Sequence, residues 1–234
     1  MFEERPTEVV SSRAEVTNAF LRGVYLWMAC GLGITAVFAF LTISSETLLR
    51  AIVFNKFVFY GLIIGELVLV VALSSAIHKL SSAAASGLFI LYSVLNGMTL
   101  SVVLLAYTSQ SVFTAFLSTA GMFGAMSLYG LVTKRDLTGM GSFMTMGLFG
   151  ILIAMVVNMF LGSGTMDLII SVLGVFIFLG LTAYDTQAIR NMGESAPMDD
   201  ELAIRRGTIM GALKLYLDFI NIFLMLLRLF GSRR

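Results

Sequence analysis

Two carboxyl groups stand in consecutive apolar segments near the end of this chain, and they are the residues best suited to do chemistry. Asp185 lies in GLTAYDTQAI and Asp218 in LKLYLDFIN, with Lys214 one helical turn before Asp218. A carboxylate in hydrocarbon costs at least about 2.5–3.5 kcal/mol. We therefore expect each acid to have a partner or a use.

The two aspartates are expected to meet. If the two segments are antiparallel neighbours, Asp185 near the end of one lies at the depth of Asp218 near the start of the next. Two carboxyls at one site cannot both ionise cheaply, so the pair holds a proton at mild pH and loses it as the pH rises. Their oxygens also suit a hard cation such as Ca²⁺, with carbonyl and water ligands making up about six to eight.

Other polar side chains at membrane depth each have a structural alternative. Glu66 lies mid-segment in GLIIGELVLVV, where a neutral buried acid would only donate or accept hydrogen bonds. Lys214 and Asp218 can neutralise each other at i, i+4. That pairing would leave Asp185 as the acid that titrates. The remaining amides at membrane depth are Asn96, Asn158 and Asn221. Of these, Asn221 shares a helix face with Asp218.

The composition indicates what kind of protein positions these residues. The 234-residue chain is 58% hydrophobic and 12% charged, whereas soluble domains carry about 25% charged residues. Its mean hydropathy is +0.94. We predict an all-α, polytopic membrane protein. Cys30 is the only cysteine and His78 the only histidine, which excludes a disulfide framework and a multi-histidine metal site. A net charge of +1 argues against nucleic acid as a partner.

A span needs about 20 mostly apolar residues, and seven segments qualify. We predict a polar tail over 1–19, a membrane domain over 20–232, and a charged connector over 190–208. The spans are 20–42, 55–77, 84–107, 111–132, 143–161, 167–189 and 209–230. We predict that the seventh also crosses, which places the C-terminus on the outer side. Its Lys214 and Asp218 make re-entry the alternative.

Basic residues near the span ends predict a cytoplasmic N-terminus. With that orientation nine lie on the cytoplasmic side and four on the other. The nine are Arg5, Arg13, Arg22, Lys79, Lys134, Arg135, Arg190, Arg205 and Arg206, and the four are Arg50, Lys56, Arg233 and Arg234. Small residues are expected to let helices pack closely, namely Gly121, Gly124, Ala125, Gly147, Gly150, Gly174 and Gly180.

Enzymatic motifs are lacking. The sequence contains no HExxH, GxSxG or Walker loop, and the second aspartate lacks the GxGD context of a two-aspartate intramembrane protease. We predict no enzymatic activity and no cofactor.

Three stretches resemble the Bax inhibitor (TMBIM) family, in its bacterial YbhL/YccA-like branch. They are MFGAMSLYGLVTKRDLTGMG (122–141), GLTAYDTQAIRNMG (180–193) and GALKLYLDFINIFLMLLRLFG (211–231). The similarity runs from about Arg22 to Arg234.

The resemblance implies seven helices, with the last helix central to two three-helix layers, in a bacterial inner membrane. It implies a pH-sensitive Ca²⁺ leak whose sensor is an aspartate dyad, matched here by Asp185 and Asp218, with Glu66 in the ion pathway. Some members latch a basic residue of the second helix onto the dyad. The candidate counter-charges here are Lys79, His78 and Lys214, with Asn221 and Asn158 as supporting polar groups.

Two other functions are compatible with this sequence. The first is a regulator of stress or cell death that acts through protein contacts, with a membrane-anchored quality-control protease as a candidate partner. Its surfaces would be the tail 1–19 and the connector 190–208. The second is a proton-coupled transporter of a small solute that uses the same acids as a relay. A structural membrane protein with neutral acids is the alternative without a transport function.

Overall fold

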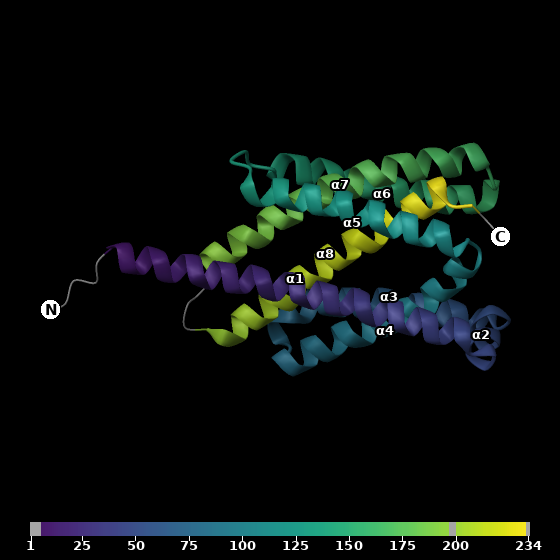
Figure 1. The fold of residues 1–234 in the computed structure, drawn as a ribbon, viewed down its shortest axis with the longest axis horizontal. Coiled ribbons are helices and arrows are strands. Elements are labelled where there is room, and N and C mark those ends of the chain that lie inside the picture. The colour runs from purple at the N-terminus through teal and green to yellow at the C-terminus, as the bar shows by residue number, and fades with distance from the viewer. Residues whose placement is uncertain (1–5, 197–199, 233–234) are drawn as a thin grey trace. The chain divides into compact units, whose positions relative to one another are not determined.

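The computed structural model describes residues 6–196 and 200–232, with side chains from residue 13 onward. Its elements are α1 (Pro6–Ser44), α2 (Glu46–Val53), α3 (Lys56–Ala76), a 3₁₀ turn (Ile77–Lys79), α4 (Ser82–Leu105), α5 (Ser109–Val132), α6 (Thr138–Leu161), α7 (Gly164–Ser195) and α8 (Glu201–Phe230) (Figure 1). Seven of these helices are long and apolar enough to cross a membrane. The predicted all-α, seven-span membrane protein is confirmed.

Two helices extend beyond their predicted spans, because charged residues pair along one helix face. α7 ends later and α8 begins earlier than predicted, so most of the predicted connector 190–208 is helical. Arg190 Nε lies 3.4 Å from Glu194 Oε1, and Arg205 Nη2 lies 2.6 Å from Glu201 Oε1. Pairs spaced i, i+4 stabilise a helix outside the apolar core as well.

α1 likewise begins at Pro6, inside the predicted polar tail 1–19. The helix continues there because its inner face has partners. Thr17 is buried, and a Cβ added to Gly193 would stand 3.3 Å from its methyl group. Arg13 Nη1 donates to the carbonyl oxygen of Glu194. The remaining tail residues 1–5 lie outside the described residues, as do Arg5, Arg233 and Arg234, which the orientation prediction used.

The short helix α2 is not predicted, since its eight residues are too few for a span. Its local signals are nevertheless clear in the structure. The Ser45 hydroxyl caps it by accepting from Leu48 N at 3.4 Å. Arg50 pairs with Glu46 at 2.6 Å, and Ile52 is buried.

The helices form two compact units, which are described separately. The first unit comprises Met1–Val103 and Ile189–Leu213, and the second comprises Leu104–Ala188 and Lys214–Arg234. α7 and α8 therefore contribute one part to each unit.

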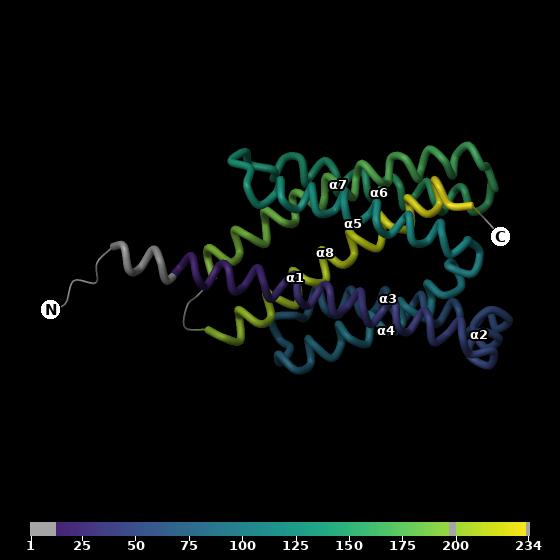
Figure 2. Tube along the Cα trace, viewed as in Figure 1, coloured from purple at the N-terminus to yellow at the C-terminus, as the bar shows by residue number. Residues whose placement is uncertain are grey.

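α8 is the most buried span. In its most apolar window 72% of residues are buried, against 50% in α7 and 6% in α3 and α6. Figure 2 traces α8 as one continuous helix. Its 30 residues measure about 45 Å. The unbroken helix favours crossing over re-entry, while the two-layer arrangement stays a prediction.

Only some of the glycines that were expected to pack do so. Gly121, Gly124 and Gly150 have open space where a Cβ would stand. In the second unit, a Cβ would come within 2.9 Å of a neighbouring side chain at three others: Gly147 against Ile177, Gly174 against Met225 and Gly180 against Met144. One close approach that was not predicted is at Gly130, where a Cβ would overlap the carbonyl oxygen of Ala183 in α7.

Gly130 and Gly124 make a matched test of this α5–α7 contact. Ala in place of Gly favours a helix by up to about 1 kcal/mol, so Gly124→Ala should leave the melting temperature in detergent equal or higher. Gly130→Ala should lower it, because overpacking costs about 1–3 kcal/mol and each kcal/mol shifts a protein of this size by about 2–4 °C. Equal melting temperatures for the two variants would refute the close contact.

Candidate functional site

The turn of α7 that carries Asp185 is fixed from two sides. On one side, the hydroxyl oxygens of Thr186 and of Ser127 in α5 are 3.1 Å apart and buried. On the other, the ring of Tyr184 fills the space beside Gly141 of α6, where no Cβ would fit. Asp185 lies between these two contacts in sequence, so its backbone has little freedom to move.

Gln187 extends this anchoring to the α5–α6 loop. Its Oε1 accepts from Leu137 N at 2.9 Å, and its Nε2 donates to Arg135 O at 2.8 Å. The loop itself is stabilised by Thr138, whose hydroxyl and N–H donate to Asp136 Oδ1 at 2.6 and 2.9 Å. These bonds lower the pKa of Asp136.

Asp218 is held on the most buried part of α8. Its side chain is only 4% exposed, and its neighbours Leu215 and Tyr216 are fully buried. Its carboxyl interacts electrostatically with Asp185 and Lys214 and has Thr182 as a hydrogen-bonding neighbour. Its Oδ2 atom is buried and has no hydrogen-bond partner among the described residues. A buried oxygen without a partner costs about 1–3 kcal/mol or more, so this atom needs a proton, a water or a cation.

Lys214 pairs with Asp185. Lys214 Nζ lies 3.1 Å from Asp185 Oδ1, across the α7–α8 contact. Among the described residues this is the ion pair that Lys214 forms, so the expected pair with Asp218 at i, i+4 is not seen. The Lys214 side chain is 42% exposed and the Asp185 side chain 14%. The ammonium therefore joins the acid nearer to open space and leaves the deeper acid without a direct counter-charge.

Both aspartates and Lys214 line one cavity of about 500 Å³, here called the dyad cavity. The structure thus places Asp185, Asp218, Lys214 and Asn221 around one cavity. α6 contributes only uncharged residues to it. The lining is Thr145, Leu148, Leu152, Phe178, Leu181, Tyr184, Asp185, Lys214, Leu217, Asp218 and Asn221.

The oxygen atoms that line the dyad cavity could act as ligands for a weakly held cation. Asn221 Nδ2 donates to Leu217 O at 2.8 Å, which leaves its Oδ1 able to accept. Two carboxylates and one amide oxygen are fewer ligands than a tight Ca²⁺ site supplies. No group of three or more His, Cys, Asp or Glu side chains suited to a metal occurs in the described part of the chain.

Glu66 belongs to the first unit and has neutral partners there. Thr99 Oγ1 donates to Glu66 Oε1 at 2.5 Å, and Asn96 Nδ2 donates to Oε2 at 3.3 Å. Asn96 also donates to the Tyr92 hydroxyl at 3.4 Å. Both carboxyl oxygens are satisfied, so Glu66 links α3 to α4 whatever else it does.

The remaining predicted residues lie elsewhere. Asn158 ends α6: it accepts from Ser163 N at its Oδ1 (3.0 Å) and from Gly162 N at its carbonyl oxygen (2.7 Å), where Gly162 has a φ of +62°. His78 and Lys79 lie in the 3₁₀ turn of the first unit and form no ion pair with other described residues.

Sequence reasoning missed a second ion pair between α7 and α8. Arg228 Nη1 lies 3.2 Å from Asp167 Oδ1. Each residue lies near the end of a span, where charged side chains are common, so the sequence gives no signal for this pair. The pair holds the opposite end of the α7–α8 contact from Lys214 and Asp185.

Comparisons with known proteins cover nearly the whole chain. A family model described as "Inhibitor of apoptosis-promoting Bax1" matches residues 17–234. The Inner membrane protein YbhL of Escherichia coli K12 is 47% identical over 230 residues, 98% of each chain. An uncharacterized protein of Borreliella burgdorferi is 48% identical over 219 residues, 94% of each chain. One of Deinococcus radiodurans is 45% identical over 216 residues, 92% of this chain and 91% of that one.

The Glu66 contacts generate a stability prediction. Glu66→Leu should lower the melting temperature in detergent, because it leaves the Thr99 and Asn96 donors unsatisfied at about 1–3 kcal/mol each. Glu66→Gln keeps an acceptor for Thr99 and should melt closer to the wild type. A Leu variant at least as stable as the Gln variant would show that these bonds do not stabilise the fold.

Proposed function

The chain belongs to the Bax inhibitor family, and from that premise we propose that it is a pH-sensitive Ca²⁺ leak of a bacterial inner membrane. Its gate is the dyad of Asp185 and Asp218. The inner-membrane location is supported by the name of the E. coli relative and by the seven apolar helices. The chemistry of the dyad cavity supports the rest.

One observation carries the proposal. The fully enclosed Asp218 oxygen without a partner lies in the same cavity as the Lys214–Asp185 ion pair. This arrangement holds two acids and one base, so it has one negative charge to neutralise. A proton does so in one state, and a cation from solution does so in the other.

The mechanism follows from that charge balance. In the closed arrangement the dyad carries one proton and Lys214 neutralises the other carboxylate. Loss of the proton as the pH rises leaves two adjacent carboxylates facing a single ammonium. Ca²⁺ then competes with Lys214 for the carboxylate oxygens. The titratable groups that line the cavity are Tyr184 and Asp185 from α7 and Lys214 and Asp218 from α8, while α6 supplies none.

The strength of the Lys214–Asp185 ion pair determines how easily Lys214 leaves Asp185 when a cation arrives. The α7 turn at Asp185 is anchored, whereas the Lys214 side chain is half-exposed and has space to move. We therefore assign the movement to Lys214 and α8 rather than to Asp185. The small number of strong ligands suits passage of a cation, which needs binding weak enough to allow release.

Removal of both carboxylates tests the gate. Purified protein in liposomes that contain a Ca²⁺ indicator should show Ca²⁺ flux that changes with pH. Asp185→Asn combined with Asp218→Asn should abolish that pH dependence, because no carboxyl group remains in the dyad cavity.

Asp167→Asn is the matched control, since it removes an α7 acid outside the dyad cavity, and it should keep the pH dependence. A double dyad variant with the pH response of the wild type would rule out the dyad as sensor. Flux that persists without Ca²⁺ and requires another solute would instead favour the proton-coupled transporter.

Lys214 variants test the competition step. Lys214→Met should raise Ca²⁺ flux at fixed pH by about fivefold, the factor that corresponds to about 1 kcal/mol for a partly exposed ion pair. Lys214→Arg should stay near the wild type. Arg205→Met removes another cation from α8 and should have no effect. Unchanged or reduced flux in Lys214→Met would contradict the role of Lys214 as resident counter-charge.

A further inference from the structure

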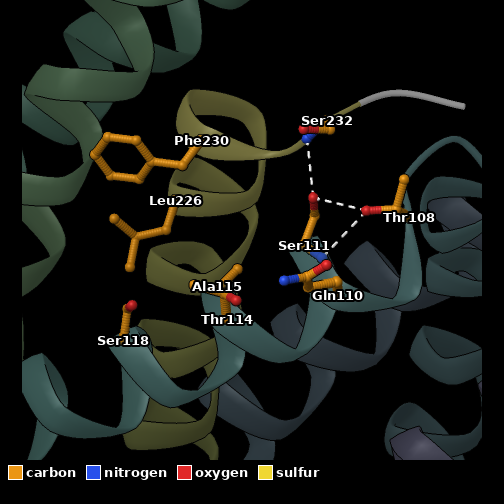
Figure 3. Close-up of a pocket in the computed structure, with 9 residues that line it drawn as sticks. All are labelled: Thr108, Gln110, Ser111, Thr114, Ala115, Ser118, Leu226, Phe230 and Ser232. Atoms are coloured by element: carbon orange, nitrogen blue, oxygen red, sulfur yellow. Dashed lines mark hydrogen bonds between the residues drawn. The ribbon is translucent and has the colours of Figure 1, made fainter.

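A second cavity of about 340 Å³ lies in the same unit, at the start of α5 and the end of α8. We call it the α5–α8 cavity. Figure 3 shows its lining: hydroxyl and amide side chains project from successive turns of α5, while Leu226 and Phe230 project from α8. The lining is Thr108, Gln110, Ser111, Thr114, Ala115, Ser118, Leu226, Phe230 and Ser232.

The upper edge of this cavity is closed by hydrogen bonds. Ser232 N donates to Ser111 Oγ at 3.0 Å, and Thr108 N donates to Ser232 O at 3.1 Å (Figure 3 draws the first). The Thr108 hydroxyl lies 2.9 Å from Ser111 Oγ. These bonds hold the end of α8 on the first turn of α5, so the cavity is part of the fold and not a gap between loose ends.

Two hydroxyls in the cavity differ from others in the spans. Hydroxyls in these helices commonly donate to the carbonyl four residues earlier, as Thr119 does to Ala115 O at 2.7 Å and Ser171 does to Asp167 O at 2.8 Å. Thr114 and Ser118 make no hydrogen bond within the described residues.

Gln110 likewise makes no hydrogen bond there. Gln110, Thr114 and Ser118 are spaced by four, so they lie along one face of α5, and all three are exposed to the cavity side.

The depth of these groups makes water necessary. Ser118 lies nine residues after the start of α5 at Ser109, about 13 Å along the helix, and half of the hydrocarbon layer is about 15 Å. An unsatisfied polar group in hydrocarbon costs several kcal/mol. A cavity of this size has room for several waters, each with polar partners on the α5 face.

The chemistry of the lining indicates what else enters. No charged side chain occurs among its described lining residues, and the polar atoms are neutral oxygens and one amide. Such a wall suits a hydrated cation in passage, because it can replace part of the hydration shell without holding the ion. Along α8, Leu226 stands eight residues, about 12 Å, beyond Asp218 of the dyad cavity.

We infer that the α5–α8 cavity is a water-filled vestibule through which the cation passes between the dyad and the membrane side at which α5 begins. Gln110, Thr114 and Ser118 line its polar wall and contact the hydrated ion. This inference rests on the proposed leak function for the identity of the ion, while the presence of water in the vestibule does not depend on that function.

Cysteine accessibility tests the vestibule in the full-length protein. In a Cys30→Ala background, Thr114→Cys and Ser118→Cys are made singly. Phe113→Cys and Ala120→Cys are the controls, because both residues are exposed on the same helix but do not line the cavity. A charged, membrane-impermeant methanethiosulfonate is added to right-side-out and to inverted vesicles, and Ca²⁺ flux is measured before and after.

We expect the Thr114 and Ser118 variants to be modified from one membrane side at least tenfold faster than the controls, with loss of Ca²⁺ flux on modification. Equal rates at all four positions, or no modification at Ser118→Cys, would overturn the water-filled vestibule. Rapid modification without a change in a measurable flux would overturn its place on the pathway. If the unmodified protein shows no Ca²⁺ flux, the leak function fails, but the modification rates still decide whether the vestibule exists.

Discussion

The need to neutralise two carboxyls inside an apolar bundle is the constraint on which this structure depends. Asp218 is nearly inaccessible, and one of its oxygens has no partner among the described residues. Asp185 has a partner, but that partner is a half-exposed lysine on α8. An arrangement with one base for two acids is stable only if a proton or a cation supplies the missing charge. On our proposal, that requirement makes the site responsive to both.

Contacts between neutral groups surround the dyad and hold the turn that carries Asp185. The α7 turn is held by the Ser127–Thr186 contact and by Gln187, and the close approach at Gly130 leaves no space for a shift. These contacts involve neutral groups, so a change in pH does not alter them. The proposed change of charge would thus act on one anchored turn of α7 and on the half-exposed Lys214.

Much of the fold could be predicted from the sequence, because long uncharged segments have few alternatives to membrane helices. The aspartate pair could be predicted as well, since an acid in an apolar segment is costly. The helix ends could not be predicted from hydropathy. The i, i+4 ion pairs of Arg190 and Arg205 extend α7 and α8 beyond the apolar segments. The packing of single glycines could not be predicted either, because it depends on which helix face meets a neighbour. Gly124 and Gly130 in one helix differ for that reason alone.

The partner of Lys214 was the other feature that spacing alone could not decide. Both Asp218, one turn away on the same helix, and Asp185, on the next helix, were within reach, and tertiary contact selected Asp185. The same holds for Thr114 and Ser118, whose hydroxyls have the sequence context of ordinary self-bonded residues. That they make no hydrogen bond within the described part of the chain is visible only from the structure.

Proton release on Ca²⁺ binding tests the central claim most directly. Titration calorimetry of the purified protein in buffers of different ionisation enthalpy counts the protons exchanged when Ca²⁺ binds. In the proposed mechanism Ca²⁺ displaces the proton carried by the dyad. The wild type at mild pH should then release up to about one proton for each ion bound, and Asp218→Asn should release none. Ca²⁺ binding without proton release in the wild type, or with equal release in the variant, would contradict the account.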